Sequence, residues 1–517
     1  MPGIMEFEFG SAGGNRPQRK ESSPFVMLVL GNFAGNTREN TRPDPALLMQ
    51  IPVRQVDIDN IDQLWSVFTP ALELDIAGNH VELAPRDLDD FHPDQLFQQL
   101  PLFSELRQLR KRLLDPVTST EALAEVTASS QAREASDQSA QVTQGARAQD
   151  EAESGNQMFE RLLGERPEQA TSTSTPPVST QSKLDSFLQR VVGPHVVYEL
   201  DPKAETAVDA VDLAIAATMR NILHHPDFQQ LEGAWRSLYD LVQESEIGEE
   251  LQLKVCNVSK DELLAGLPDS AESMADSGLY QLLVGRFRRA ADDDGFSVLL
   301  CNYSFGGDAN DVALLATMGT LAEEQDAAVI AAAESELIGA YSLAQQPAAN
   351  EWSKAENPFW SQLRESPVAG RIGLVLPRIL GRLPYGRNAE EIDSFDFEEI
   401  DVGNEDASGH ESFLWVNPTL ACGKLLAQSF TEYGWNMSPD NNTDIGGLPA
   451  YSYELDGEQK LMPCAELLLP ERSAEAILGL GIMPIVSFRN RDMARLLRFQ
   501  SVSKPLSALL GPWETHS

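Results

Sequence analysis

The stretch Phe25-Val-Met-Leu-Val-Leu-Gly-Asn-Phe-Ala-Gly35 sets six apolar residues in a row directly before a Gly-Asn pair. An unbroken apolar run of this length that ends in turn residues is typical of a buried strand. Residues 52–59 and 72–76 alternate apolar and polar side chains, which is the pattern of half-buried strands. Asn60 is placed to cap a helix that ends near Phe68, and residues 94–114 repeat apolar side chains at helical spacing. The sequence therefore predicts a small α+β domain over residues 23–115, after a flexible start over residues 1–22.

The composition changes at Pro116, and residues 116–181 consist largely of Ala, Ser, Thr, Gln and Glu. Such a segment cannot bury enough apolar surface to offset the entropy of ordering it, so we expect a disordered linker. One short helix is expected near residues 157–164, where Met158-Phe-Glu-Arg-Leu-Leu-Gly164 ends in a glycine stop. A similar string, Phe187-Leu-Gln-Arg-Val-Val-Gly193, follows it. The two strings indicate either a docking peptide for a partner or a coincidence of local packing, and both interpretations remain open.

Residues 182–517 make up the larger part of the chain. Helical patterns cover residues 204–221, 227–242 and 311–324. Strand-like runs occupy residues 251–255, 297–301, 327–330 and 372–376. Because strands and helices alternate, we expect a mixed sheet with covering helices. The fold class expected for the whole chain is therefore a mixture of α+β and α/β, with a small N-terminal domain, a disordered linker and a larger mixed-sheet domain.

Charge and cysteine usage narrow the class of protein. The 39 basic and 79 acidic residues give a formal net charge of −40, and such a surface repels nucleic-acid phosphates and anionic lipid headgroups. The four cysteines are far apart and form no CxxC pair, which fits a reducing compartment better than a disulfide framework. The sequence contains no apolar run of about 18 residues and begins without an apolar leader segment. We expect a soluble, cytoplasmic protein that neither binds nucleic acid nor inserts into a membrane.

Catalytic and cofactor motifs are missing from the sequence. Gly423-Lys424 lacks the upstream glycine loop of a phosphate-binding motif, and Gly479-Leu-Gly481 lacks the third glycine of a dinucleotide fingerprint. The adjacent His224 and His225 would point about 100° apart on a helix, which favours a structural role at a helix junction over metal binding. We therefore expect no enzyme, no catalytic residue, no cofactor and no metal. The alternative of another class is a hydrolase that uses Asp and Glu residues in an unrecognised site.

Two groups of arginines are candidates for assembly contacts. Arg378 and Arg382 lie beside the apolar run at residues 372–376, where they could form fixed salt bridges or contacts between subunits. Arg489 and Arg491, with Arg495, form a basic cluster near the C-terminal end. That cluster is either a solvated helix face or a contact with an acidic neighbouring copy.

Several strings carry a resemblance to a known family. They are Ile222-Leu-His-His-Pro-Asp-Phe228, Ala234-Trp-Arg-Ser-Leu238, Val255-Cys-Asn-Val-Ser-Lys260, Ser277-Gly-Leu-Tyr280, Ile372-Gly-Leu-Val-Leu-Pro-Arg378, Arg382-Leu-Pro-Tyr-Gly386 and His410-Glu-Ser-Phe-Leu-Trp415. Together they resemble the large subunit of the type VI secretion contractile sheath (TssC, VipB or ImpC) over residues 182–501. The opening stretch at residues 25–35, followed by Val53-Arg54 and Asp89-Asp-Phe-His-Pro-Asp94, resembles the small subunit (TssB, VipA or ImpB). The chain looks like a fusion of the two.

The resemblance implies a structural subunit that stacks with other sheath subunits around an inner tube, on a baseplate, and contracts to export protein. It also implies recycling by an AAA+ ATPase through a docking helix, for which the matching residues are Leu184, Phe187, Leu188, Val191 and Val192. The match fades after Gln500, so a C-terminally truncated large subunit is expected, without the segment that interlocks neighbouring copies. The runner-up within this class is an accessory, capping or regulatory paralogue that binds the sheath but does not propagate it.

Overall fold

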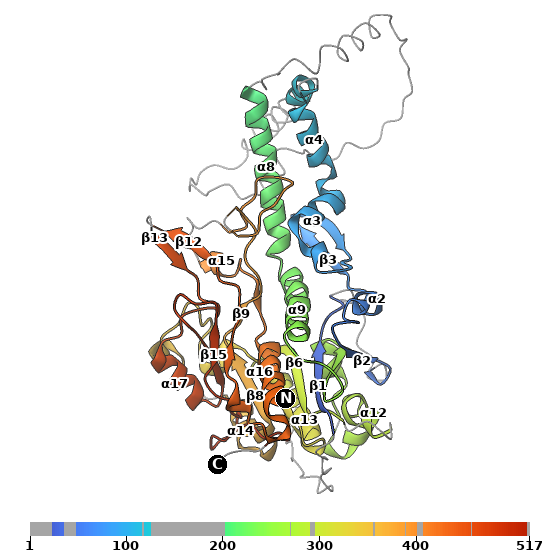
Figure 1. The fold of residues 1–517 in the computed structure, drawn as a ribbon, viewed down its shortest axis with the longest axis vertical. Coiled ribbons are helices and arrows are strands. Elements are labelled where there is room, and N and C mark those ends of the chain that lie inside the picture. Colours follow the sequence, from blue (N-terminus) through green and yellow to red (C-terminus); the bar gives the residue numbers. More distant parts are fainter. Residues whose placement is uncertain are drawn as a thin grey trace, which may run out of the picture.

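A nine-stranded mixed sheet forms the centre of the part of the chain that the structure describes (Figure 1). The structure is a computed structural model, and it describes residues 23–35, 48–115, 118–125, 202–268, 270–289, 295–354, 357–387, 389–400, 407–455 and 458–513. The strands of this sheet are β1 (Phe25–Gly31), β2 (Val53–Val56), β5 (Leu251–Asn257), β6 (Val298–Phe305), β7 (Ala328–Ala333), β8 (Ile372–Leu376), β11 (Asp444–Ile445), β14 (Met483–Ser487) and β15 (Ala494–Leu496). Their order is β11-β15-β14-β8-β7-β6-β1-β5-β2. The strands from β14 to β5 run parallel, and antiparallel strands flank them at both edges.

Strand β1 lies inside the sheet, between two strands that come more than 200 residues later in the chain. It pairs in parallel with β5 and β6, and Val29 lies opposite Val255 on one side and Leu300 on the other. All seven of its residues are buried, as the unbroken apolar run predicts. The sequence predicts separate N-terminal and C-terminal domains. In the structure, strands from both regions form one sheet. Their strands pair within one chain, a point that sequence alone leaves open.

Helices cover both faces of the sheet. Phe25, Met27 and Val29 of β1 belong to one core cluster, and Val26 and Leu28 belong to the cluster on the opposite face. On the first face, α16 (Thr419–Tyr433) packs directly against the sheet and α9 (Pro226–Gln243) packs against α16, while α8 (Pro202–Leu223) continues the same apolar cluster from α9. The second face packs against α10 (Lys260–Ala265), α11 (Gly278–Tyr280), α12 (Arg286–Arg289), α13 (Ala309–Glu324) and α14 (Pro358–Glu365). Among the described helices, none has both the length and the apolar character that a membrane span requires.

Smaller elements complete the fold around this three-layered body. Three two-stranded sheets pair β3 (Leu72–Ile76) with β4 (Asn79–Leu83), β9 (Ile379–Leu380) with β10 (Trp415–Val416), and β12 (Ser452–Leu455) with β13 (Glu458–Leu461). Four more helices are α2 (Gln63–Phe68), α3 (Pro93–Gln99), α15 (Ala407–His410) and α17 (Glu471–Gly479). Helix α4 (Ser104–Leu114) lies alongside α8, and the two extend from the body together (Figure 1).

Two local predictions for the N-terminal region need correction. The helical pattern over residues 94–114 is split into α3 and α4, because Pro101 has no N–H to donate and cannot continue a helix from Leu100. Asn60 is not the cap of α2, which begins later, with Asp62 at the N-cap position. The Asn60 side chain instead accepts a hydrogen bond from the Asp57 N–H, at 3.1 Å, in the turn before the helix.

The predicted linker over residues 116–181 falls outside the described residues, apart from residues 118–125. Residues 119–125 are helical, and Ala122 is fully buried in the first core cluster. The expectation of disorder from residue 116 is therefore wrong at this point, because Ala122 and Leu123 find an apolar surface to pack against. The flexible start over residues 1–22, the short helix near residues 157–164 and the docking helix around Leu184 to Val192 lie outside the described residues.

Candidate functional site

An aromatic seam joins the N-terminal region to α9. The rings of Trp65 and Trp235 stack with centroids 3.7 Å apart, and the Trp235 Nε1–H donates to the Phe33 carbonyl at 3.0 Å. The Trp65 Nε1–H donates to the Tyr239 hydroxyl at 2.8 Å, and that hydroxyl donates to Asp62. Trp235 is completely buried, so each ring pairs its one polar atom while the rest of the ring contributes apolar burial. The seam fixes where α2 and the end of β1 lie on α9.

A loop over residues 389–400 contacts α3 through hydrogen bonds and an aromatic pair. The Asp94 carboxylate accepts the backbone N–H groups of Asp393 and Ser394, at 3.1 and 3.0 Å. Phe97 packs against Phe395 with ring centroids 4.9 Å apart. Two segments about 300 residues apart in sequence are thus held by one carboxylate and one aromatic pair.

A buried ion cluster ties the end of this loop, at Glu399, to Arg382 in the segment before the loop. The Arg382 guanidinium donates to Glu232 Oε1 at 2.8 Å and to Glu399 Oε2 at 2.7 Å. Its Nη2 also donates to Glu399 Oε1 at 2.9 Å, and Arg236 Nε donates to Glu232 Oε1 at 2.8 Å. Two carboxylates are therefore matched by two guanidinium groups, with Tyr385 packed 4.2 Å below the Arg382 guanidinium. The cluster joins α9 to the segment after β9.

The electrostatics of the buried cluster favour the charged forms of Glu232 and Arg382. Burial on its own would raise the pKa of Glu232, but the neighbouring Arg382 and Arg236 outweigh that effect and leave the pKa below its ordinary value. Burial would lower the pKa of Arg382, and Glu232 and Glu399 reverse this and raise it. Arg382 is only 5% exposed. Of the two roles suggested by its sequence position, a fixed internal salt bridge and a contact between subunits, the geometry of Arg382 is that of the first.

The adjacent histidines His224 and His225 make different contacts at the junction of α8 and α9. The His225 Nδ1 accepts the Asp227 N–H at 3.3 Å and so caps α9, whose first residue is Pro226. His224 instead faces the buried cluster, with Nε2 3.8 Å from Glu399 Oε1. Burial, followed by Arg382 and Arg220, lowers the pKa of His224 to about 4, so its imidazole is neutral at physiological pH.

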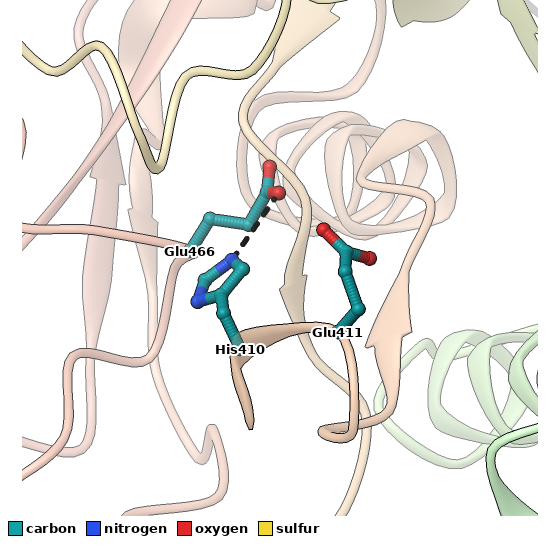
Figure 2. A group of neighbouring side chains, drawn as sticks. All are labelled: His410, Glu411 and Glu466. Carbon is teal, nitrogen blue, oxygen red and sulfur yellow. Dashed lines mark ion pairs between the residues drawn. The ribbon is translucent and has the colours of Figure 1, made fainter. Parts of the chain in front are cut away.

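A second ion cluster surrounds Arg378, at the other end of β9. The Arg378 Nη2 donates to Glu466 Oε1 at 2.5 Å and to Glu411 Oε1 at 2.9 Å, and the Arg378 backbone N–H donates to Glu466 Oε2 at 3.0 Å. Figure 2 shows the His410 imidazole turned toward Glu466, where Nε2 lies 3.6 Å from Oε1. Burial would raise the pKa of Glu466, but His410 and Arg378 outweigh it and lower that pKa to about 2. Glu466 is therefore a permanent anion and no general acid near neutral pH.

The carboxyl end of the parallel strands is where open α/β sheets usually bind ligands. Here the backbone N–H groups of the loop after β6 donate to carboxylates of the same chain. The Gly306 N–H donates to Asp311 Oδ2 at 2.6 Å, and the Gly307 N–H donates to Glu336 Oε1 at 2.7 Å. Lys260 pairs with Asp311 at 2.6 Å. Because these backbone donors already bind carboxylates, this loop does not present the free N–H groups that a phosphate needs.

The basic cluster near the C-terminal end lies on a hairpin and not on a helix. Arg489 and Arg491 occupy the turn between β14 and β15, where Asn490 has a φ of 58°. Both arginines are exposed, and the expected helix face is wrong because this turn requires a left-handed residue that breaks a helix. Arg495 lies on β15 and binds Asp444 through two hydrogen bonds of 2.5 and 2.9 Å. Arg489 and Arg491 are thus the two predicted contact residues that face solvent most openly.

Sequence reasoning found the arginines of these clusters but missed their partners. Glu399 and Glu466 carry no local signal, because each meets its arginine only through the tertiary fold. Glu232 has a local signal for Arg236, four residues later on α9, but none for Arg382. Asp94 belongs to a string singled out for its resemblance to the small subunit, and that string is the one hint of its role.

Comparison with known proteins gives two matching family models and one relative. A model described as VipB, tail sheath N-terminal domain, matches residues 205–503, and a model described as VipA of the type VI secretion system matches residues 8–134. The type VI secretion system sheath protein TssC1 of Pseudomonas aeruginosa is 31% identical over 314 residues, which are 58% of this chain and 61% of TssC1. The chain thus spans about three fifths of the length of this relative.

Proposed function

The chain belongs to the VipB tail sheath family, and on that premise we propose that it is a structural subunit of a type VI secretion contractile sheath. One observation carries the proposal. The segment that matches VipA supplies β1, and the segment that matches VipB supplies the strands on both sides of it. A small-subunit part and a large-subunit part therefore form one sheet in one chain.

In this proposal the work of the protein is mechanical. Copies stack with other sheath subunits on a baseplate, enclose an inner tube in the cytoplasm, and export protein when the stack contracts. Such a subunit must transmit force without changing its own shape. The aromatic seam, the loop closed over α3 and the buried Arg382 cluster support this role, since close-packed and charge-matched cores transmit strain. The free energy of contraction then lies in contacts between subunits.

The state of the acidic residues supports a protein without catalytic activity. Glu232, Glu399 and Glu466 are bound to arginines, and the pKa values of Glu232 and Glu466 are lowered. A hydrolase built on two carboxylates needs one with a raised pKa as the acid. Glu334 does have a raised pKa, through partial burial, and the charged neighbours that act on it include Lys260, which is itself paired with Asp311.

Two surfaces are proposed for partners. Arg489 and Arg491 carry positive charge on an exposed turn and suit an acidic patch on a neighbouring copy, since the whole chain is strongly acidic. Arg378 is 37% exposed at its side chain and could exchange an internal carboxylate for one on a neighbour. For the AAA+ ATPase, the proposed docking residues remain Leu184, Phe187, Leu188, Val191 and Val192.

Negative-stain electron microscopy of the purified full chain tests the proposal, alone and co-expressed with the other sheath subunits of its organism. We expect hollow tubes in at least one of these conditions. Binding only at the ends or sides of tubes made by other subunits would replace the proposal with an accessory role. The proposal is refuted if the chain forms no tubes and associates with no tubes made by other subunits. The double variant Arg489→Glu/Arg491→Glu should shorten or abolish the tubes, while Arg387→Glu, which changes an exposed arginine paired with Asp396, controls for the change in charge.

A further inference from the structure

Three metal-ligating side chains converge beside α15. His410, Glu411 and Glu466 offer one imidazole nitrogen and two carboxylates, and the three ligand atoms all lie within 4.8 Å of one another. Figure 2 shows the imidazole and the Glu466 carboxylate turned toward each other, with Glu411 alongside. Among the described residues, no other group of three His, Cys, Asp or Glu side chains is this close. The ion pairs with Arg378 account for the two glutamates but not for the imidazole beside them.

A ring contact and a backbone hydrogen bond hold the imidazole of His410 in place. The His410 ring stacks on Trp415 with centroids 4.9 Å apart, and the Trp415 Nε1–H donates to the His410 carbonyl at 2.8 Å. The His410 Nε2 is shielded from solvent and has no hydrogen-bond partner, since the nearest Glu466 oxygen is 3.6 Å away. A buried polar atom without a partner costs free energy, which a bound ion would recover. Its position is fixed before any ion binds.

Arg378 is the cation that this group holds within the chain. Its Nη2 lies 2.5 Å from Glu466 Oε1 and 2.9 Å from Glu411 Oε1. One guanidinium thus faces two carboxylates. The Arg378 side chain reaches solvent, and its backbone N–H would still hold Glu466 Oε2 after the guanidinium moved away. The guanidinium can therefore be replaced by another cation without loss of the Glu466 position.

We propose that His410, Glu411 and Glu466 bind one divalent transition-metal ion, in competition with the guanidinium of Arg378. One nitrogen and two carboxylate oxygens suit Zn²⁺, with water as the fourth ligand. The ion would tie the end of α15 to the segment that follows β13, and so brace the surface around β9 and β10. The proposal is independent of the sheath function, because it concerns only these side chains.

Metal titration of the full chain tests the proposal. After dialysis against a chelator, Zn²⁺ binding is measured by calorimetry and Co²⁺ binding by its visible absorption spectrum. We expect one bound ion per chain and a raised Tm with Zn²⁺. His410→Gln and Glu411→Gln should each weaken binding by about tenfold or more. Arg378→Gln should strengthen binding, because the competing cation is gone.

The control is His80→Gln, because His80 lies 3.6 Å from Glu82 on an exposed hairpin and has no third ligand close enough. This variant should bind Zn²⁺ like the unaltered chain. Glu411 is 57% exposed at its side chain, so Glu411→Gln keeps the fold and the test remains decisive even if a His410 variant is unstable. Absence of a stoichiometric ion, or equal affinity in the unaltered chain and both ligand variants, would overturn the proposal. Unchanged affinity in Arg378→Gln would overturn the competition with the guanidinium.

Discussion

Arg378 and Arg382 flank the same two-residue strand, β9, yet they occupy different surroundings. Arg382 pairs with Glu232 and Glu399, and all three side chains are almost completely buried. Water therefore cannot take the place of a missing partner. Arg378 pairs with Glu411 and Glu466 at the surface, where water can replace one partner. Removal of one member of a buried ion pair leaves the other as an uncompensated charge, which costs far more than loss of an exposed pair. The two arginines should therefore differ in their effect on stability.

Substitution Arg382→Met should lower the free energy of unfolding by about 3–5 kcal/mol, because Glu232 and Glu399 would remain buried without their main counter-charge. Urea unfolding followed by tryptophan fluorescence measures the loss. Arg387→Met is the matched control, since Arg387 pairs with Asp396 in an exposed position, and it should cost less than about 1 kcal/mol. Equal losses for the two variants would contradict a role of the buried cluster in holding the fold.

His224 predicts a dependence of stability on pH. Its pKa in the folded chain is about 4, against 6.5 for the free side chain, because burial and the nearby Arg382 and Arg220 disfavour the imidazolium. The folded state therefore binds fewer protons than the unfolded state between these two values, and stability falls as the pH falls through that window. From pH 7.5 to pH 5 the contribution of His224 should fall by about 2 kcal/mol.

The variant His224→Gln isolates this contribution, since glutamine does not protonate. The difference in unfolding free energy between the unaltered chain and the variant should shrink or reverse by about 2 kcal/mol between pH 7.5 and pH 5. Glu399 is the acid that faces His224, at 3.8 Å, and it stays bound to Arg382 in both proteins. A difference that is constant across this range would show that His224 is accessible to protons in the folded chain.

The sequence predicted only some of these side-chain contacts. The positions of Arg378 and Arg382 beside an apolar strand suggested either fixed salt bridges or contacts between subunits, and within the chain both arginines form ion pairs. The partner acids could not be named, because Glu232 lies 150 residues before Arg382 and nothing in the intervening sequence encodes their meeting. The use of His225 as a helix cap is local, and the Pro226 that follows it pointed to a helix start.

At the scale of elements, the loop over residues 389–400 holds α3 mainly through Asp94. One carboxylate serves two backbone N–H groups, those of Asp393 and Ser394. The contact between Phe97 and Phe395 is apolar and tolerates small shifts, whereas the two hydrogen bonds fix the register of the loop on the helix. Asp94 is therefore the residue on which the placement of this loop depends.

Asp94→Ala should lower the unfolding free energy by about 1–3 kcal/mol, because two backbone donors lose their acceptor. Hydrogen exchange should speed up at residues 393 and 394, while exchange in the strands of the large sheet should not change. Asp75→Ala is the control, since Asp75 accepts a backbone N–H only within its own hairpin, from Gly78. Faster exchange over residues 389–400 in both variants, or in neither, would show that Asp94 does not hold the loop.

Element prediction succeeded where the local pattern and the tertiary environment agree. The strand-like runs at residues 25–30, 251–255, 297–301, 327–330 and 372–376 all fall in strands of the large sheet. The inner strands β1 and β8 are buried at every residue because both of their faces are covered, whereas β5, next to the edge strand β2, alternates apolar and polar side chains over residues 251–255. The helix over residues 94–114 failed at Pro101, a breaker inside an otherwise regular pattern. The turn at Asn490 was taken for a possible helix face because arginines at short spacing do not distinguish a hairpin from a helix.

At the scale of the whole molecule, the shared sheet is the main feature that sequence did not predict. A strand that pairs with partners more than 200 residues away gives no sign of which partners it will choose. The domain boundary near residue 115 reflects a change in composition, whereas the hydrophobic core crosses it: Phe25, Trp65 and Phe91 lie in the same cluster as Trp235 and Leu425. The two sheath-like parts are one folding unit, with a central strand contributed by the shorter part.

Cleavage between the two parts tests this claim most directly. A protease recognition site is introduced between residues 140 and 150, outside the described elements, and the purified chain is cut and passed over a size-exclusion column with light scattering. We predict that the fragments co-elute as a one-to-one complex with the mass of the uncut chain, and that they separate only in denaturant, because β1 and the aromatic seam stay buried. Separation of the cut fragments under native conditions, with each fragment still folded, would contradict a single shared sheet.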